Sequence, residues 1–290
     1  MSKLKYGCEG LVAVISGGTS GIGLAAAAKL AADGARVYIL GRSRAKGEAA
    51  VRQLQEAIGA AALRRSDAQT QGEAFFVPCD VSKAASCKEA VAKIGEREKS
   101  LLREQQAHID ILINSAGVYA EQRLENMTEA DYSAIMDTNV KGTLLLTQAC
   151  LPLMYSGGSI INIASDAGVS GNYGCPVYCA SKGAVVSLTR ALALDLAPQI
   201  RVNCVCPADV DTPLLARQLV DANGGYTLAD MAASYPLGRI GRAEEIAHVI
   251  CSVASPANSF MSGSIITVDG GITAGKNRPY ITSIVSLHED

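Results

Sequence analysis

The chain has 290 residues, a net charge of -2 and a hydrophobic share of 49%. These values are typical of a soluble globular protein with one large domain or two small ones. Lys and Arg are not in surplus over Asp and Glu, so nucleic acid and acidic membranes are not expected as partners.

Runs rich in Val and Ile alternate along the chain with Ala-rich helical stretches. Strands are predicted at residues 11–16, 36–40, 74–79, 109–114, 159–164, 201–206 and 264–268. Helices are predicted at residues 22–33, 83–106, 129–154, 176–196 and 243–254. This alternation predicts an α/β fold in which a seven-stranded parallel sheet carries helices on both faces. No linker or repeat divides the chain, so a single domain over residues 1–290 is expected, with its core at about 11–271.

Two segments look like additions to this core. Residues 59–72 are polar and irregular in pattern, which predicts a long surface loop. Residues 272–290 follow the last predicted strand and mix Ile and Val with charged residues. This C-terminal extension is either a loose end or a cover for a neighbouring molecule or a pocket mouth.

The first predicted strand runs directly into the sequence "SGGTSGIG", in which Gly17, Gly21 and Gly23 precede and open a helix. Glycine allows a tight turn and close approach to a pyrophosphate, whose negative charge suits the exposed amides of a helix start. A glycine motif alone can be a simple tight turn. Its place between a strand and a helix favours a doubly wound, Rossmann-like dinucleotide site instead. The remaining residues of this expected cofactor contact are Thr19, Ser20 and Ile22.

The end of the second strand indicates which dinucleotide is bound. Gly41 occupies the place where NAD sites usually carry an acidic residue, and Arg42 follows it directly. An arginine here can pair with the extra phosphate of NADP, and Ser43 can add a hydrogen bond. The sequence therefore favours NADP(H) over NAD(H). The alternative is that Arg42 or Arg44 is only a solvated charge at a helix start.

Further small and polar residues stand where later strands end. They are Asp80 and Val81 in "CDV", Asn114, Ala116 and Gly117 in "NSAG", and Ser165 in "SIINIAS". Strand ends in an open α/β sheet face the ligand crevice, so these groups are expected to converge. Tyr178 and Lys182 lie four residues apart on one face of a later helix, for which Pro176 suits the first turn.

In this order, the motifs resemble those of the short-chain dehydrogenase/reductase family. The resemblance covers about residues 11–271 and rests on "SGGTSGIG", "CDV", "NSAG", Asn139, Ser165, Tyr178 with Lys182, "CVCPADVDTP" and "ITVDGG". It implies strand order 3-2-1-4-5-6-7 and assembly into tetramers or dimers through two long helices and the last strand. It also implies cofactor contacts from Pro207, Val210 and Thr212. The chain departs from the family pattern at Ser115, where an asparagine is usual, and at Ala208, where a glycine is usual.

The resemblance implies a catalytic set of Asn139, Ser165, Tyr178 and Lys182. A tyrosine with an ordinary pKa of about 10 is a poor base, so the positive charges of Lys182 and the oxidised nicotinamide are expected to lower it. Tyr178 would then exchange the substrate hydroxyl proton during hydride transfer. Ser165 would bind the substrate oxygen, Asn139 would hold a water, and Lys182 would also bind the nicotinamide ribose.

Each of these residues also has an ordinary structural interpretation. Ser165 can cap a turn, Asn139 can satisfy a helix kink, Tyr178 can be a half-buried aromatic residue and Lys182 a solvated charge. Their joint spacing behind a nucleotide loop favours catalysis. Cys175 and Cys179 flank the tyrosine, but without a nearby histidine they indicate packing or sensitivity to oxidation rather than a nucleophile.

Residues 213–237 occupy the place where the family varies its substrate lid. This segment is largely apolar through Leu214, Leu215, Leu219, Val220, Tyr226, Leu228, Met231 and Tyr235. Either the apolar residues receive a neutral alcohol or ketone, or much of this surface packs on the core. A hydroxysteroid or bile acid is favoured over a 3-oxoacyl thioester and a sugar or polyol. A non-catalytic protein that senses NADP is the alternative of another class.

The remaining features concern the cellular setting and metals. The N-terminus has no apolar run suited to a signal or spanning segment, which favours a cytoplasmic protein. Nine cysteines without a Cys-x-x-Cys pair argue against a disulfide framework. His108, His248 and His288 are far apart, so no metal site is expected. The expected partners are a small apolar substrate and further copies of the chain.

Overall fold

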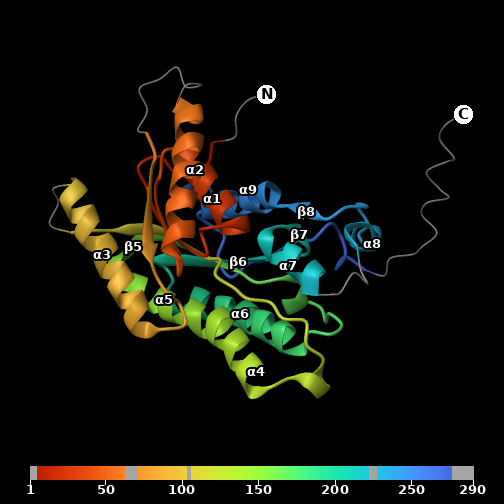
Figure 1. Ribbon diagram of the computed structural model, residues 1–290. Coiled ribbons are helices and arrows are strands. Elements are labelled where there is room, and N and C mark those ends of the chain that lie inside the picture. The colour runs from red at the N-terminus through yellow and green to blue at the C-terminus, as the bar shows by residue number, and fades with distance from the viewer. Residues whose placement is uncertain (1–4, 63–70, 103–105, 222–226, 276–290) are drawn as a thin grey trace, which may run out of the picture.

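The computed structural model describes residues 5–62, 71–102, 106–221 and 227–275, and Figure 1 shows their arrangement. The strands are β1 (Val12–Ser16), β2 (Arg36–Gly41), β3 (Glu73–Pro78), β4 (Ile109–Asn114), β5 (Met154–Ile163), β6 (Ile200–Pro207), β7 (Val210–Asp211), β8 (Gly241–Arg242) and β9 (Ile265–Val268). The helices are α1 (Gly21–Ala32), α2 (Arg44–Ala62), α3 (Ala84–Leu102), α4 (Glu129–Met136), α5 (Gly142–Cys150), α6 (Pro176–Asp195), α7 (Pro213–Asp221), α8 (Leu228–Ser234) and α9 (Ala243–Ala254).

Seven strands form one parallel sheet in the order β3-β2-β1-β4-β5-β6-β9. The chain order reverses between β1 and β4, which creates the crevice where α/β sheets bind ligands. The carboxyl ends of the central strands are level, because Ser16 pairs with Asn114 and Asn114 pairs with Asn162. The sequence prediction of a single-domain, Rossmann-like sheet in this order is confirmed.

The two faces of the sheet are covered by different helices (Figure 1). Ala13 and Ile15 of β1 pack in one buried cluster with residues of α1 and α9. Val12 and Val14, which point to the opposite face, pack in a second cluster with residues of α3 and α5. Alternation of side chains along a strand explains why both faces need apolar residues, and why these strands have continuous Val and Ile runs.

Several predicted boundaries differ from the structure. Helix α2 continues to Ala62, so the first part of the predicted 59–72 loop is helical, and residues 63–70 lie outside the described residues. The predicted 129–154 helix is divided into α4, a π-helical turn (Asp137–Lys141) and α5. Strand β5 begins at Met154 rather than at 159, because Gly157 adopts a φ of 96° where the pairing with β4 is irregular.

Candidate active site

The turn between β1 and α1 has the backbone that a phosphate-binding loop requires. Gly17 and Gly21 have φ values of 65° and 53°, which favour glycine. At Gly23, a Cβ atom would lie 2.6 Å from the Gly17 carbonyl oxygen. Helix α1 begins here with Ser20 as N-cap residue, its side chain makes no cap hydrogen bond, and the first turn has no acidic residue. The turn therefore offers open amides at a helix start, which suit an anion.

Two other segments approach this turn. A Cβ atom on Gly21 would lie 3.2 Å from Thr212 Cγ2, which places the segment after β6 beside the glycine loop. Val210 in the same segment is buried in β7, which pairs with β8. At Gly117, a Cβ atom would lie 3.4 Å from Asn139 Oδ1 and 3.5 Å from Lys182 Nζ. Glycine at these positions leaves no side chain between the approaching segments, which suits the close approach of a nicotinamide dinucleotide.

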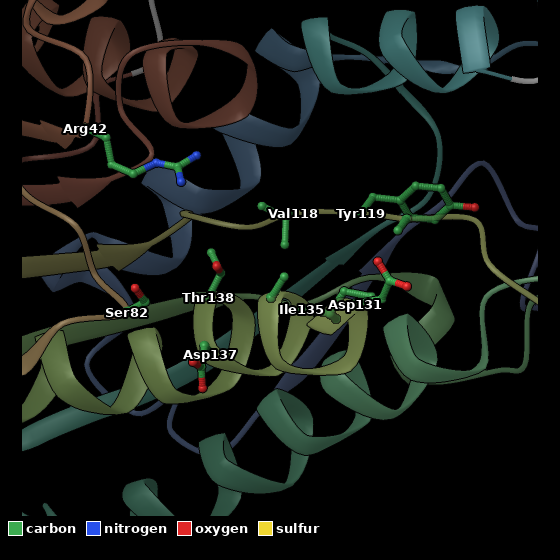
Figure 2. Close-up of a pocket in the computed structure, with 10 residues that line it drawn as sticks. Arg42, Ser82, Val118, Tyr119, Asp131, Ile135, Asp137 and Thr138 are labelled. Carbon is green, nitrogen blue, oxygen red and sulfur yellow. The ribbon is translucent and has the colours of Figure 1, made fainter. Parts of the chain in front are cut away.

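A cavity of ≈350 Å³ lies beyond the carboxyl ends of β2, β3 and β4 (Figure 2). Figure 2 shows Arg42 entering it from the end of β2, while Ile135 and Thr138 enter from the opposite side. Ser82 and Val118 also line it. Ser82 and Val118 directly follow the motifs at the ends of β3 and β4, whereas Ile135 of α4 and Thr138 of the π-helical turn were not indicated by any motif.

Several residues that were expected to contact the cofactor form side-chain hydrogen bonds within the protein. Ser43 Oγ accepts a hydrogen bond of 3.4 Å from the Lys46 amide at the start of α2. Asp80 Oδ1 accepts from the Ser82 amide and hydroxyl. Asn114 Nδ2 donates to Thr147 Oγ1 and to Asn162 Oδ1. The side-chain amide of Asn114 therefore joins β4 to β5 and α5, and it supports the site from within the core.

Asn139 lies in the π-helical turn and is buried. Its Oδ1 accepts from the Val118 amide at 2.8 Å, and its Nδ2 donates to the Val118 carbonyl and to Ser181 Oγ, both at 3.0 Å. Both amide hydrogens are thus used within the protein. The Asn139 main-chain carbonyl accepts from the Thr143 hydroxyl at 2.8 Å. The role of Asn139 in holding a water stays a prediction.

Ser165, Tyr178 and Lys182 meet at the carboxyl end of β5. Ser165 follows this strand, and its side chain lies close enough to Tyr178 on α6 to oppose the rise of the tyrosine pKa. Lys182 Nζ lies 5.7 Å from the centre of the Tyr178 ring and donates to the Ile163 carbonyl at 3.0 Å. The ring of Tyr119 packs edge-on against Tyr178 at 4.8 Å between centroids. The four predicted catalytic side chains therefore share one site, and Tyr119 is an addition that no motif indicated.

Burial raises the pKa of the Tyr178 hydroxyl, the carboxylates of Asp166 and Asp209 raise it further, and the contact with Ser165 opposes them. Burial also lowers the pKa of Lys182 to about 8. The expected lowering of the tyrosine pKa is therefore not produced by the chain alone, because desolvation and nearby carboxylates outweigh the lysine. The surroundings that the chain provides therefore favour the protonated form of the Tyr178 hydroxyl.

Acidic residues near the site were missed in the sequence. Asp166 is buried beside Ser165, and Asp209 accepts a hydrogen bond of 2.7 Å from the Tyr235 hydroxyl. Asp166 and Asp209 both have raised pKa values, chiefly because of burial. The available signal was their position, directly after Ser165 and after Pro207-Ala208.

The two cysteines beside Tyr178 are close together. Their sulfur atoms are 3.8 Å apart, and both approach the Asn172 carbonyl oxygen. Burial raises the pKa of Cys175 to about 12, with the neighbouring Cys179 acting in the same direction. A protonated, buried thiol is a poor nucleophile, which agrees with the expectation of packing.

The expected substrate lid consists of α7 and α8 where it is described. Leu215, Met231 and Tyr235 are buried, whereas Leu214 and Leu228 are exposed. The lid is thus partly packed on the core and partly open. The side chain of Val220, Tyr226 and most of the 272–290 extension lie outside the described residues.

No helix in the described ranges is long and apolar enough to cross a membrane. The same ranges hold no group of three or more His, Cys, Asp or Glu side chains placed to bind a metal.

Comparison with known proteins gives the class of this chain. A family model described as enoyl-(acyl carrier protein) reductase matches residues 17–273. The 3-oxoacyl-[acyl-carrier-protein] reductase of Thermotoga maritima is 33% identical over 91% of this chain and 98% of its own. The trans-4-hydroxycyclohexanecarboxylate dehydrogenase of Sinomonas cyclohexanicum is 34% identical over 96% of this chain and 98% of its own. A solved short-chain dehydrogenase/reductase of Brucella melitensis, described as glucose/ribitol dehydrogenase, has a TM-score of 0.79 and 32% identity, covering 93% of this chain and 99% of that chain.

These matches extend over nearly the whole chain, which belongs to the short-chain dehydrogenase/reductase family. It is an NAD(P)-dependent oxidoreductase that acts on alcohols or ketones.

Proposed function

We propose that the protein interconverts a secondary alcohol and a ketone with NADP(H), using Tyr178 as general acid and base. The observation that carries this proposal is the meeting of Ser165, Tyr178 and Lys182 at the carboxyl end of β5, with Lys182 beside Gly117. When bound, the nicotinamide accepts or supplies the hydride. Tyr178 takes the hydroxyl proton during oxidation and returns it during reduction. Ser165 orients the substrate oxygen, and Lys182 supplies positive charge near the phenolate.

The preference for NADP(H) is supported by both Gly41 and Arg42. A Cβ atom on Gly41 would lie 2.8 Å from Thr19 Cγ2, so an acidic side chain that binds the NAD ribose does not fit there without a shift. Arg42 lines the cavity and can pair with a phosphate.

Arg42→Ala should weaken NADPH binding roughly tenfold to a hundredfold, because a charge-assisted hydrogen bond is lost, and should leave NADH binding unchanged. Arg44→Ala is the matched control, because Arg44 is exposed and faces Glu48. Equal effects of both substitutions on NADPH binding would contradict the role of Arg42.

For the substrate, we favour a largely apolar, ring-bearing secondary alcohol such as a hydroxysteroid or bile acid. The exposed apolar residues of α7 and α8 support this class, and one relative is named for dehydrogenation of a hydroxycyclohexanecarboxylate. Reduction of a 3-oxoacyl thioester and oxidation of a diol or sugar remain alternatives, since relatives carry such names.

A panel of steroid, acyl and sugar alcohols with their ketones, assayed with NADP(H) and NAD(H), tests the proposal. Turnover of a ring-bearing alcohol with NADP is expected, and turnover that requires NAD would contradict the cofactor assignment. Tyr178→Phe should abolish the activity found. Full activity of this variant would contradict the mechanism, and a protein that binds NADPH but turns over no member of the panel would instead be a cofactor sensor.

We also propose that the protein is a homo-oligomer, a dimer or tetramer. Leu144 on α5, Leu194 on α6 and Phe260 before β9 are exposed apolar residues on the elements through which the family is implied to assemble. Light scattering after size exclusion should give a multiple of the chain mass, and Leu194→Glu should reduce it. A monomer at all concentrations would contradict the proposal. A cytoplasmic location stays a prediction.

A further inference from the structure

Asp166 is a buried carboxylate at the reacting end of the site. It follows Ser165 directly, and both residues are 7% exposed. The Ser165 hydroxyl donates to Asp166 Oδ1 at 2.7 Å, and the Ala167 amide donates to the same oxygen at 2.8 Å. The short helical turn Asp166–Gly168 thus holds the carboxylate in place beside the serine.

The groups around Asp166 supply no positive charge. The groups that influence it electrostatically are Tyr178 on α6, Tyr235 after α8, Asp209 after β6 and Asp269 at the end of β9. In the described part of the chain, Asp166 forms no salt bridge with Lys or Arg, and Lys182 donates to the Ile163 carbonyl instead. The pKa of Asp166 is raised, chiefly by burial. The carboxylate is therefore charged without compensation or becomes protonated.

The hydrogen bond decides what Ser165 can offer a substrate. A serine hydroxyl has one proton, and an ionised carboxylate can only accept. While Asp166 is ionised, the proton of Ser165 is directed at Oδ1. The serine oxygen also accepts from the Ala167 amide at 3.2 Å, which leaves it one further lone pair for the substrate. That arrangement complements an alcohol bound beside a protonated Tyr178, because the tyrosine then donates to the alcohol oxygen and the alcohol proton is free for Ser165. It does not complement a ketone, which only accepts.

We propose that Asp166 is a positioning residue that sets whether Ser165 accepts a hydrogen bond from an alcohol or donates one to a ketone. A protonated Asp166 donates to the serine oxygen and releases the serine proton for the ketone carbonyl. Ketone binding and protonation of Asp166 therefore favour each other, whereas alcohol binding favours the ionised form. The inference rests on the proposed role of Ser165 at the substrate oxygen.

The effect of Asp166 on Ser165 must be measured as the affinity of the protein for the ketone and for the alcohol. The overall equilibrium constant limits the kcat/KM values of the two directions, so no substitution can favour one of them freely. Complexes that cannot react avoid this constraint: the ketone bound with NADP⁺ and the alcohol bound with NADPH. Cyclohexanone and cyclohexanol are suitable probes, because neither titrates.

In the wild-type protein, cyclohexanone should bind the NADP⁺ complex roughly tenfold more tightly at a pH where Asp166 is protonated than where it is ionised, the effect of one charge-assisted hydrogen bond. Cyclohexanol should show the opposite trend with NADPH. Asp166→Ala should bind cyclohexanone tightly at every pH, because the serine proton is free. Asp166→Asn, of similar shape, should also lose the pH dependence.

Two further variants separate the possible outcomes. Asp209→Asn is the matched control: it removes another buried carboxylate, so the pH dependence should persist with its midpoint moved to lower pH. Ser165→Ala should lose the difference between ketone and alcohol. A pH dependence retained in Asp166→Ala, or cyclohexanone that binds the wild type equally at all pH values or not at all, would overturn the proposal. Because no turnover is measured, failure of the proposed function, seen as full activity of Tyr178→Phe, is a separate result.

Discussion

Two buried carboxylates in this protein have opposite surroundings. Glu98 on α3 is fully buried and receives hydrogen bonds from the Arg36 guanidinium at 2.8 Å and the Tyr38 hydroxyl at 2.6 Å. Asp166, after β5, receives bonds only from a neutral hydroxyl and a neutral amide. The first carboxylate has its charge compensated and links α3 to β2. The second remains uncompensated beside Ser165 and Tyr178, where its proton can respond to what is bound.

Burial alone does not identify a functional acid, because both carboxylates are buried and only Asp166 lies at the site. A buried charge without a cation costs stability, and the protein tolerates that cost at the reacting end of the sheet. The difference between the two regions can be tested by substitutions that separate effects on stability from effects on activity.

The largest expected effect comes from the two tyrosines that accompany these carboxylates. Tyr178→Phe should lower kcat by about 10²–10⁴, because it removes the proposed proton donor, with a small change in stability. Tyr38→Phe should leave kcat near the wild-type value but lower the free energy of unfolding by about 1–3 kcal/mol, because Glu98 loses a buried donor. Steady-state kinetics and denaturant unfolding of both variants check these two expectations. Similar losses of activity in both variants would contradict the distinction between a catalytic and a stabilising tyrosine.

Removal of Glu98 itself should be the largest perturbation of stability. Glu98→Ala leaves Arg36 without its buried partner and should lower the free energy of unfolding by about 3–5 kcal/mol. Glu89→Ala on the same helix breaks only the exposed pair with Lys93, so its unfolding midpoint should not move measurably. Equal midpoints for the two variants in urea would show that the Arg36–Glu98 pair, which joins β2 to α3, does not stabilise the fold.

The pH dependence of activity should report Lys182. Because burial lowers its pKa to about 8, the lysine loses its proton as the pH rises through that region, and kcat/KM for ketone reduction should fall there. Lys182→Arg keeps the charge and should move this fall to higher pH, even if its overall rate is lower. An alkaline limb at the same pH in both proteins would assign the limb to another group.

The smallest expected effect concerns the stability cost of Asp166. Its pKa is raised in the folded protein, so the group is most favourable at low pH and destabilises the fold as the pH rises through the folded-state pKa. Asp166→Asn should therefore raise the melting temperature slightly at neutral pH and have little effect in acid. Glu98→Gln should lower it at neutral pH. Melting curves at both pH values check these signs, and a lower melting temperature for Asp166→Asn at neutral pH would contradict them.

Much of the fold and part of the site could be predicted from local patterns. A strand covered on both faces needs apolar residues at every position, so "VAVIS" and "IDILIN" identify β1 and β4 without tertiary information. The glycines of the first turn follow from the backbone that a phosphate requires. The motif order also predicted the neighbourhood of Ser165, Tyr178 and Lys182, because parallel strands end at one edge of the sheet.

Sequence alone therefore determined the parallel sheet, the glycine loop and the set of polar residues at the strand ends, since each depends on local spacing or backbone conformation. Only the tertiary structure decided that Glu98 meets Arg36, that Tyr119 packs on Tyr178, and that Asp166 has no cation beside it. These contacts join segments that are distant in the chain or depend on what surrounds a buried group. Their energies are set by desolvation and by partners that only the folded arrangement of α3, α6 and the strand ends brings together.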